Sequence, residues 1–190
     1  MRFTLVAAAI IASVALPPMP ASAAPDTTPN ASIASFYGGQ IDLRRGWGDA
    51  TACSTDGVAT QCFRTEKELD GYLATQAAAA SLEADATQAL ATGDVTIAAA
   101  APCATNVRLY SNTFFGGSVL AVAIRDQVVN LSTWSFSNIT SSYQIGQCPA
   151  TFWDLANAGL PSYPGGTLAG ASATVMWSGW DNRISSLYIS

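Results

Sequence analysis

The stretch "WDNRISSLYIS", residues 180–190, determines how the second half of the chain is interpreted, because a near copy of it lies 44 positions earlier. That copy is "FSNITSSYQIG", residues 136–146. An aromatic residue, an asparagine, two consecutive serines and an isoleucine occupy the same places in both stretches. Two copies of one short pattern indicate a duplicated structural unit.

The residues around both copies favour strands. Short alternating runs such as "VRLY", "SVLAVAI" and "ATVMW" fill residues 103–190, and Gly, Asn, Ser and Pro separate them. Several short strands with turn residues between them are typical of an antiparallel all-β domain. We therefore expect a mainly β protein with its principal domain at 103–190.

Within this region, "YSNTFFGG" places Tyr110, Phe115 and Gly117 at intervals of five and two residues. This arrangement resembles the Greek key of the beta/gamma-crystallin family. The resemblance implies a sandwich of two such motifs, 103–148 and 149–190. In that family the glycine takes a backbone geometry that side chains disfavour, and a serine late in each motif caps the hairpin; Ser142 and Ser186 match that serine.

The second motif corresponds to "FWDLANAGLPSYPGG", residues 152–166. We expect Phe152 or Trp153 to start its hairpin and Tyr163 and Gly165 to finish it. This interpretation makes the hairpin loop several residues longer than in the first motif.

The resemblance also implies a calcium site at "DNRISS", residues 181–186, which matches the family's calcium loop of two Asn or Asp residues, two free positions, Ser or Thr, and Ser. By this resemblance Ser185 supplies its hydroxyl, and Asn182, Arg183 or Ile184 supplies a carbonyl. Asp181 shapes the loop or binds through water. A carbonyl near Asn112–Thr113 completes the site. Calcium takes six to eight oxygen ligands, so this chemistry is coherent.

The first copy, "SNITSS", has Ser137 where the family pattern has Asn or Asp. Its candidate ligands are Asn138, Thr140 and Ser141, and we expect a weaker site there or none. Asp and Asn also favour ordinary turns, which is the alternative for both loops.

The start of the chain predicts export. Arg2, an apolar run over 5–16 and the small residues Ala21 and Ala23 are typical of a secretory signal peptide, residues 1–23. A membrane anchor is the alternative, but the run is short for a span of about 20 residues. We expect a secreted, extracellular protein.

Cysteine usage agrees with export. The spacing of the four cysteines suggests a local disulfide, Cys53–Cys62, and a long one, Cys103–Cys148, although two other pairings fit the sequence. A zinc site is the rival interpretation, and the chain has no Cys-x-x-Cys spacing to support it.

Two segments precede the principal domain. Residues 24–64 contain turn signals and short alternating runs, so we expect a small β element clamped by Cys53–Cys62. Residues 65–92 are Ala-rich and begin with a capping box, Thr65 and Glu68. They predict a helix whose thin apolar stripe comprises Leu69, Tyr72, Leu73 and Leu82, and residues 93–102 form a linker.

The composition argues against several classes of function. The chain has no histidine, which removes Ser-His-Asp and Cys-His catalysis and the usual neutral-pH base. A net charge of −5 with a single lysine argues against nucleic-acid binding. We therefore expect no enzyme and no catalytic residues.

Three functions fit this description. The first is a secreted calcium-binding structural or binding protein. The second is a peptidase inhibitor, because small bacterial metalloproteinase inhibitors share the crystallin-like fold; "LANAGLPSYPGG", residues 155–166, is the candidate loop for an extracellular protease. The third is a module that binds carbohydrate or a cell-wall glycan through exposed tryptophans.

Overall fold

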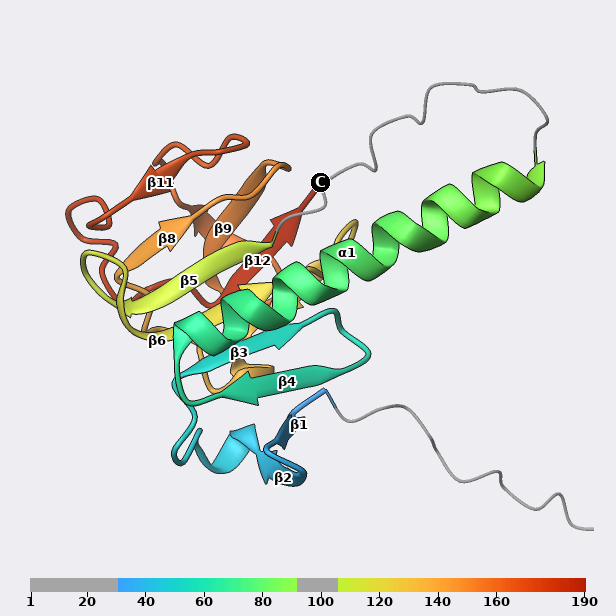
Figure 1. Cartoon of the computed structure of the whole chain (residues 1–190). Helices are drawn as coiled ribbons and strands as arrows, with labels where there is room; N and C mark the ends of the chain where they lie inside the picture. Colours follow the sequence, from blue (N-terminus) through green and yellow to red (C-terminus); the bar gives the residue numbers. More distant parts are fainter. Residues whose placement is uncertain (1–30, 92–105) are drawn as a thin grey trace, which may run out of the picture.

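The computed structural model describes residues 31–91 and 106–190 (Figure 1). The described residues do not include the predicted signal peptide (1–23), residues 24–30, the predicted linker (93–102) or Cys103. The C-terminal strands are β5 (Val107–Asn112), β6 (Gly116–Val122), β7 (Val128–Asn130), β8 (Ser142–Gln144), β9 (Ala150–Leu155), β10 (Gly159–Ser162), β11 (Ser172–Ala173) and β12 (Ser186–Ile189).

The two C-terminal motifs exchange one strand each. Strands β6, β5 and β8 of the first motif lie in one sheet with β11 of the second. Strands β10, β9 and β12 of the second motif lie in the other sheet with β7 of the first. Buried side chains between the sheets include Leu109, Leu120, Phe152 and Leu187. The predicted fold class, mainly β with two Greek-key motifs, is confirmed.

The N-terminal segment adds four strands to the first sheet. They are β1 (Ile33–Phe36), β2 (Gly39–Asp42), β3 (Ala52–Thr55) and β4 (Thr60–Phe63), and a short 3₁₀ helix, η1 (Leu43–Arg45), follows β2. Strand β3 pairs in parallel with β6, so the order of the eight-stranded sheet is β11-β8-β5-β6-β3-β4-β1-β2. We expected a separate small β element, but this segment is continuous with the crystallin-like sheet.

The N-terminal strands also share the core of the sandwich. Ala34, Leu43 and Cys53 are buried in the same apolar cluster as the C-terminal side chains. Local patterning could not reveal this arrangement, because the parallel pairing of β3 with β6 joins residues far apart in the sequence.

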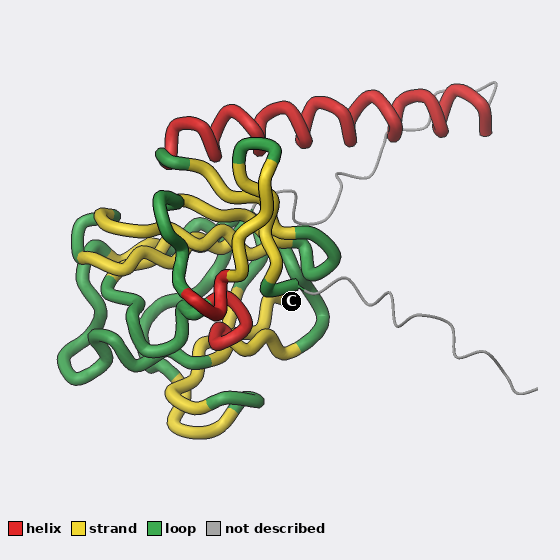
Figure 2. Tube along the Cα trace, turned by 90° about the horizontal axis from the view of Figure 1, so that it is seen from below, coloured by secondary structure: helices red, strands yellow, loops and turns green. Residues whose placement is uncertain are grey.

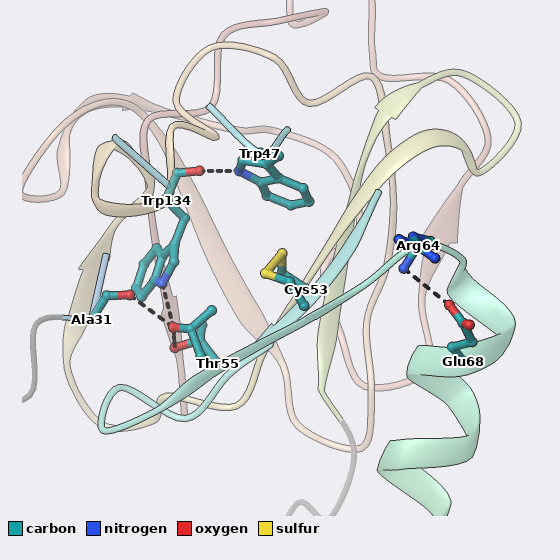
Figure 3. Close-up of a disulfide and its surroundings, with 9 residues drawn as sticks. Ala31, Trp47, Cys53, Thr55, Arg64, Glu68 and Trp134 are labelled. Atoms are coloured by element: carbon teal, nitrogen blue, oxygen red, sulfur yellow. Dashed lines mark hydrogen bonds between the residues drawn. A yellow bond between two sulfur atoms is a disulfide. The ribbon is translucent and has the colours of Figure 1, made fainter. Parts of the chain in front are cut away.

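A disulfide and two hydrogen bonds of Trp134 fasten the N-terminal segment (Figure 3). Cys53 and Cys62 are opposite each other in the β3–β4 ladder and form a disulfide, as predicted. Trp134, in the 3₁₀ helix η2 (Leu131–Trp134), donates its indole N–H to Thr60 Oγ1 at 3.1 Å, and its carbonyl accepts the Trp47 indole N–H at 2.7 Å. Cys148 is also disulfide-bonded.

Helix α1 (Glu66–Ala91) covers the outer face of the eight-stranded sheet with its first two turns (Figure 1). The predicted capping box is present: the Glu68 N–H donates to Thr65 Oγ1 at 3.3 Å, and the Thr65 N–H donates to Glu68 Oε2 at 3.0 Å. Leu69 is fully buried against an apolar patch of the sheet that includes Tyr110 and Val119.

Ion pairs hold the same end of the helix. Arg108 on β5 donates to Glu66 Oε1 at 2.8 Å and to Asp70 Oδ1 at 2.6 Å. The Tyr110 hydroxyl donates to Glu66 Oε1 at 2.7 Å, and burial together with this carboxylate raises the pKa of Tyr110 above its ordinary value.

The rest of the helix leaves the sheet and projects beyond it (Figure 2). Side chains 74–83 are all exposed, and Leu82 is 69% exposed, so this member of the predicted apolar stripe does not pack on the sheet. Within the described ranges, no helix has both the length and the apolar character that crossing a membrane requires.

Candidate metal-binding site

The first Greek-key hairpin joins β5 to β6 and is tied by Ser142, as the family resemblance predicts. The Ser142 hydroxyl donates to the Asn112 carbonyl at 2.6 Å and accepts the Phe115 N–H at 3.1 Å. Gly117 has φ +76°, and a Cβ there would collide with the Ser111 and Asn112 side chains. A glycine is therefore required at this position. The Tyr110 and Phe115 rings pack with centroids 5.4 Å apart.

The second hairpin repeats this geometry earlier in the chain than we predicted. The Ser186 hydroxyl donates to the Leu155 carbonyl at 2.6 Å and accepts the Ala158 N–H at 3.1 Å. Leu155 pairs with Gly159 as Asn112 pairs with Gly116, so the two turns have equal length.

The expected longer loop and the hairpin roles of Tyr163 and Gly165 are therefore corrected. Tyr163 lies beyond the turn, buried against Tyr143, Phe152 and Trp180. Gly165 lies beneath it, where a Cβ would collide with the Tyr163 ring.

The two predicted calcium loops, residues 137–142 and 181–186, lie against each other and are called the paired loops below. The Asn138 N–H donates to the Ile184 carbonyl at 2.8 Å, and the Asn182 N–H donates to the Thr140 carbonyl at 3.0 Å. These reciprocal bonds relate the loops by an approximate twofold axis.

Side chains repeat the same exchange. The Ser185 hydroxyl donates to Asn138 Oδ1 at 2.8 Å, and the Ser141 hydroxyl donates to Asn182 Oδ1 at 3.3 Å. Both asparagines have left-handed backbones, with φ of 61° and 56°, which Asn tolerates better than most residues. Each loop therefore presents its serine to the asparagine of the other loop.

The remaining predicted residues divide into buried and exposed positions. Ile184 and Thr140 are fully buried at equivalent places, whereas Asp181 is exposed. Arg183 forms an ion pair with Asp154, which raises the pKa of its guanidinium, and stacks over the Trp180 ring at 5.1 Å. Sequence reasoning missed this ion pair because the two residues lie 29 positions apart and no local pattern links them.

The carbonyls near Asn112–Thr113 have other partners in the structure. The Asn112 carbonyl accepts the Ser142 hydroxyl, and the Thr113 carbonyl accepts the Gly116 N–H at 3.2 Å. The groups that face Ser185 come instead from the other loop, at Asn138. The equal 44-residue offset of the two loops was the one signal in the sequence that could have indicated this pairing.

The donor set suits a hard cation. Hydroxyl, amide and backbone carbonyl oxygens converge where the paired loops meet, and calcium prefers such ligands. Residues 31–91 and 106–190 contain no cluster of three or more His, Cys, Asp or Glu side chains that could hold a metal ion. Asp181 is the one carboxylate within the paired loops. These oxygen types are ones that calcium accepts as ligands.

Thr140 offers a test of the packing at this site. Its Oγ1 is the one buried side-chain nitrogen or oxygen without a hydrogen-bond partner among the described residues. An unpaired buried hydroxyl costs about 1–3 kcal/mol, and valine has nearly the same shape. We expect Thr140→Val to raise the free energy of unfolding by about 1 kcal/mol in urea denaturation.

Thr60→Val is the matched control, because the buried Thr60 hydroxyl donates to the Ala31 carbonyl at 2.9 Å and accepts from Trp134. The same substitution should lower stability there. Destabilisation by Thr140→Val would contradict our view that the hydroxyl is unsatisfied.

Comparisons with known proteins find similar solved structures. No family model matches the chain, and no curated protein matches it. A beta/gamma-crystallin from Ciona intestinalis is 24% identical, with a TM-score of 0.38, over 45% of this chain and 99% of that one. A domain from Flavobacterium johnsoniae is 17% identical, with a TM-score of 0.36, over 44% and 92%. An archaeal beta/gamma-crystallin is 20% identical, with a TM-score of 0.35, over 45% and 98%.

The geometry of the strands and hairpins determines the fold. The motifs exchange β7 and β11, and a serine ties a five-residue turn in each. Residues 106–190 have a beta/gamma-crystallin-like fold, with the paired loops at the junction of its two motifs.

Proposed function

We propose that this protein is a secreted, non-enzymatic calcium-binding protein whose sandwich is stabilised by the ion at the paired loops. The observation that carries the proposal is the reciprocal contact of Ser185 with Asn138 and of Ser141 with Asn182. This contact brings oxygen donors from two distant segments to one place, so an ion bound there would cross-link the motifs.

The hydroxyls can serve a cation without losing their present partners. Ser141 and Ser185 are buried, at 5% and 7% exposure, and each donates its proton to an amide oxygen. A hydroxyl has two acceptor lone pairs, so a donating serine can still offer oxygen to calcium. Extracellular modules bind calcium with dissociation constants of about 10⁻⁴–10⁻³ M, which suits so few charges.

The absence of histidine from the whole sequence supports a non-enzymatic role, because the common general base is missing. Cys53, Cys62 and Cys148 are disulfide-bonded, so none of them is a thiolate nucleophile. The proposed role is binding and structural support.

The inhibitor alternative gains no support from the geometry of its candidate loop. Residues 155–159 form the serine-tied hairpin turn, and 159–162 form strand β10, paired with β9. Most of the candidate loop is thus part of the hairpin turn and of strand β10. Glycan binding would depend mainly on Trp177, which is 56% exposed, because Trp47 and Trp153 are half-buried and Trp134 and Trp180 are buried. Neither alternative has an observation comparable to the paired loops.

Calcium should raise the melting temperature of the chain without its signal peptide. A ligand at ten times its dissociation constant stabilises the folded state by about 1.4 kcal/mol, which corresponds to about 3–6 °C for a protein of this size. Differential scanning calorimetry in EGTA and in 10 mM calcium measures the shift.

Ser185→Ala should reduce the calcium-dependent shift strongly, because it removes a donor at the junction. Ser81→Ala is the control: Ser81 is exposed on α1, where its hydroxyl donates only to the Ala78 carbonyl. A melting temperature that does not respond to calcium, or an equal response of Ser185→Ala and the control, would reject the proposal.

A further inference from the structure

The eight-stranded sheet ends at β2. Among the described strands, β2 pairs with β1 alone, and its other side has no strand. An unpaired edge presents backbone N–H and C=O groups that can pair with another extended chain.

The register identifies which groups point outward. The Leu43 N–H donates to the Ser32 carbonyl at 2.8 Å, so this pair is hydrogen-bonded. Bonded and non-bonded pairs alternate along an antiparallel ladder. Gln40 and Asp42 therefore belong to non-bonded pairs with β1, and their N–H groups and the Gln40 carbonyl point to the open side.

An open groove lies at the same edge. Ile33 and Ile41 supply apolar lining, and Gly46 and Gly48 line it with backbone. The polar lining comes from Gln40, Asp42 and Arg45. Both glycines have positive φ, and a Cβ at either would meet open space, so the loop after η1 leaves the groove unfilled.

Charge at the groove selects an acidic occupant. Arg44 satisfies Asp42, with 3.0 Å from its Nε to Oδ1 and 3.1 Å from its Nη2 to Oδ2. Arg45 is 3.8 Å from Oδ2, and its side chain is 88% exposed. One carboxylate thus faces two guanidinium groups, which leaves a net positive charge beside the outward backbone groups.

We propose that β2 binds an extended, acidic peptide segment of a partner protein as an added strand. Its backbone pairs with Gln40 and Asp42, and a carboxylate of the segment pairs with Arg45. The side chain that follows the carboxylate lies on the opposite face of the added strand, toward Ile41. This site shares no residue with the paired loops, and peptide binding should not require calcium.

The test uses the chain without its signal peptide and a blocked peptide, acetyl-TVEVEVT-amide. We expect saturable binding by calorimetry, with amide shifts in NMR confined to residues 39–48. A matched peptide with lysines in place of the glutamates should bind at least tenfold more weakly. Binding should be unchanged in EGTA, which separates this proposal from the calcium proposal.

Two variants complete the test. Gln40→Pro removes the outward N–H without removing a hydrogen bond to β1, and it should weaken binding at least tenfold. Gln40→Thr retains this N–H and should leave the affinity unchanged. Arg45→Glu should weaken binding of the acidic peptide by a similar factor. Absence of saturable binding, or equal affinity of both peptides, would overturn the proposal. So would a dimer of the chain that Gln40→Pro dissociates, because a second copy would then be the occupant.

Discussion

A chain that begins at residue 103 is expected to remain unfolded, although it contains both Greek-key motifs. Such a chain leaves β6 as an open edge, because β3 pairs with it from Ala52 to Thr55. It also removes Ala34, Leu43 and Cys53 from the shared core. Small domains have a net stability of about 5–15 kcal/mol, and each large buried side chain lost removes about 1.5–3 kcal/mol. Ala50, Cys62 and the partly buried Phe36, Ile41 and Trp47 are lost with them, so the lost burial is comparable to the net stability.

Circular dichroism and urea denaturation of the 103–190 chain measure this outcome. We expect no cooperative transition, whereas chains beginning at residue 24 or 31 keep every described strand and should unfold cooperatively. A cooperative transition for the 103–190 chain, with a midpoint near that of the longer chains, would show that the crystallin-like unit is autonomous.

Trp134→Ala should be the most damaging single substitution that we can name. Trp134 is 3% exposed, and its indole N–H bonds Thr60 across the junction between η2 and β4 (Figure 3). Replacing a buried tryptophan with alanine costs about 3–5 kcal/mol through lost burial and the cavity that remains. Urea denaturation, followed by far-UV circular dichroism, should report a loss of this size.

Trp177→Ala is the matched control, since Trp177 is 56% exposed. Exposed substitutions usually change stability by less than about 0.5 kcal/mol. Trp134→Phe retains most of the buried ring and should fall between the two alanine variants. Equal stabilities of Trp134→Ala and Trp177→Ala would exclude Trp134 as the side chain that joins the N-terminal strands to the sandwich.

Local sequence patterns predicted the parts of the fold that depend on local interactions. The capping box at Thr65 and Glu68 placed the start of α1, because its hydrogen bonds span only three residues. The 44-residue repeat identified the loops at 137–142 and 181–186, and the structure places Ser142 and Ser186 in equivalent hairpin bonds.

The second hairpin was misplaced because its turn lacks the residues that marked the first. Asn157 and Ala158 take the left-handed conformations that Phe114 and Phe115 take in the first turn. The Tyr-Pro-Gly-Gly segment that follows was the more conspicuous signal, but Tyr163 serves the core. Hydrogen bonding to Ser186, which no local pattern encodes, determines the position of the turn.

Contacts between distant segments were not predicted. The parallel alignment of β3 with β6 and the crossing of Ser185 to Asn138 both depend on how the motifs assemble. The exposure of Leu82 also depends on tertiary structure, because α1 extends beyond the sheet that covers Leu69. Helical periodicity indicates which face of a helix is apolar, but not how far along the helix the sheet that packs on that face extends.

The parallel pairing of β3 with β6 also determines the order in which the chain can fold. Ala52 pairs with Val119, and the whole of α1 lies between them in the sequence. The β3–β4 hairpin is therefore synthesised well before β6, the strand with which β3 pairs. Non-local parallel pairing is slow, and waiting strands are exposed to aggregation. Both cysteines of the Cys53–Cys62 disulfide lie in the hairpin itself, so oxidation can join β3 to β4 covalently before β6 is in place.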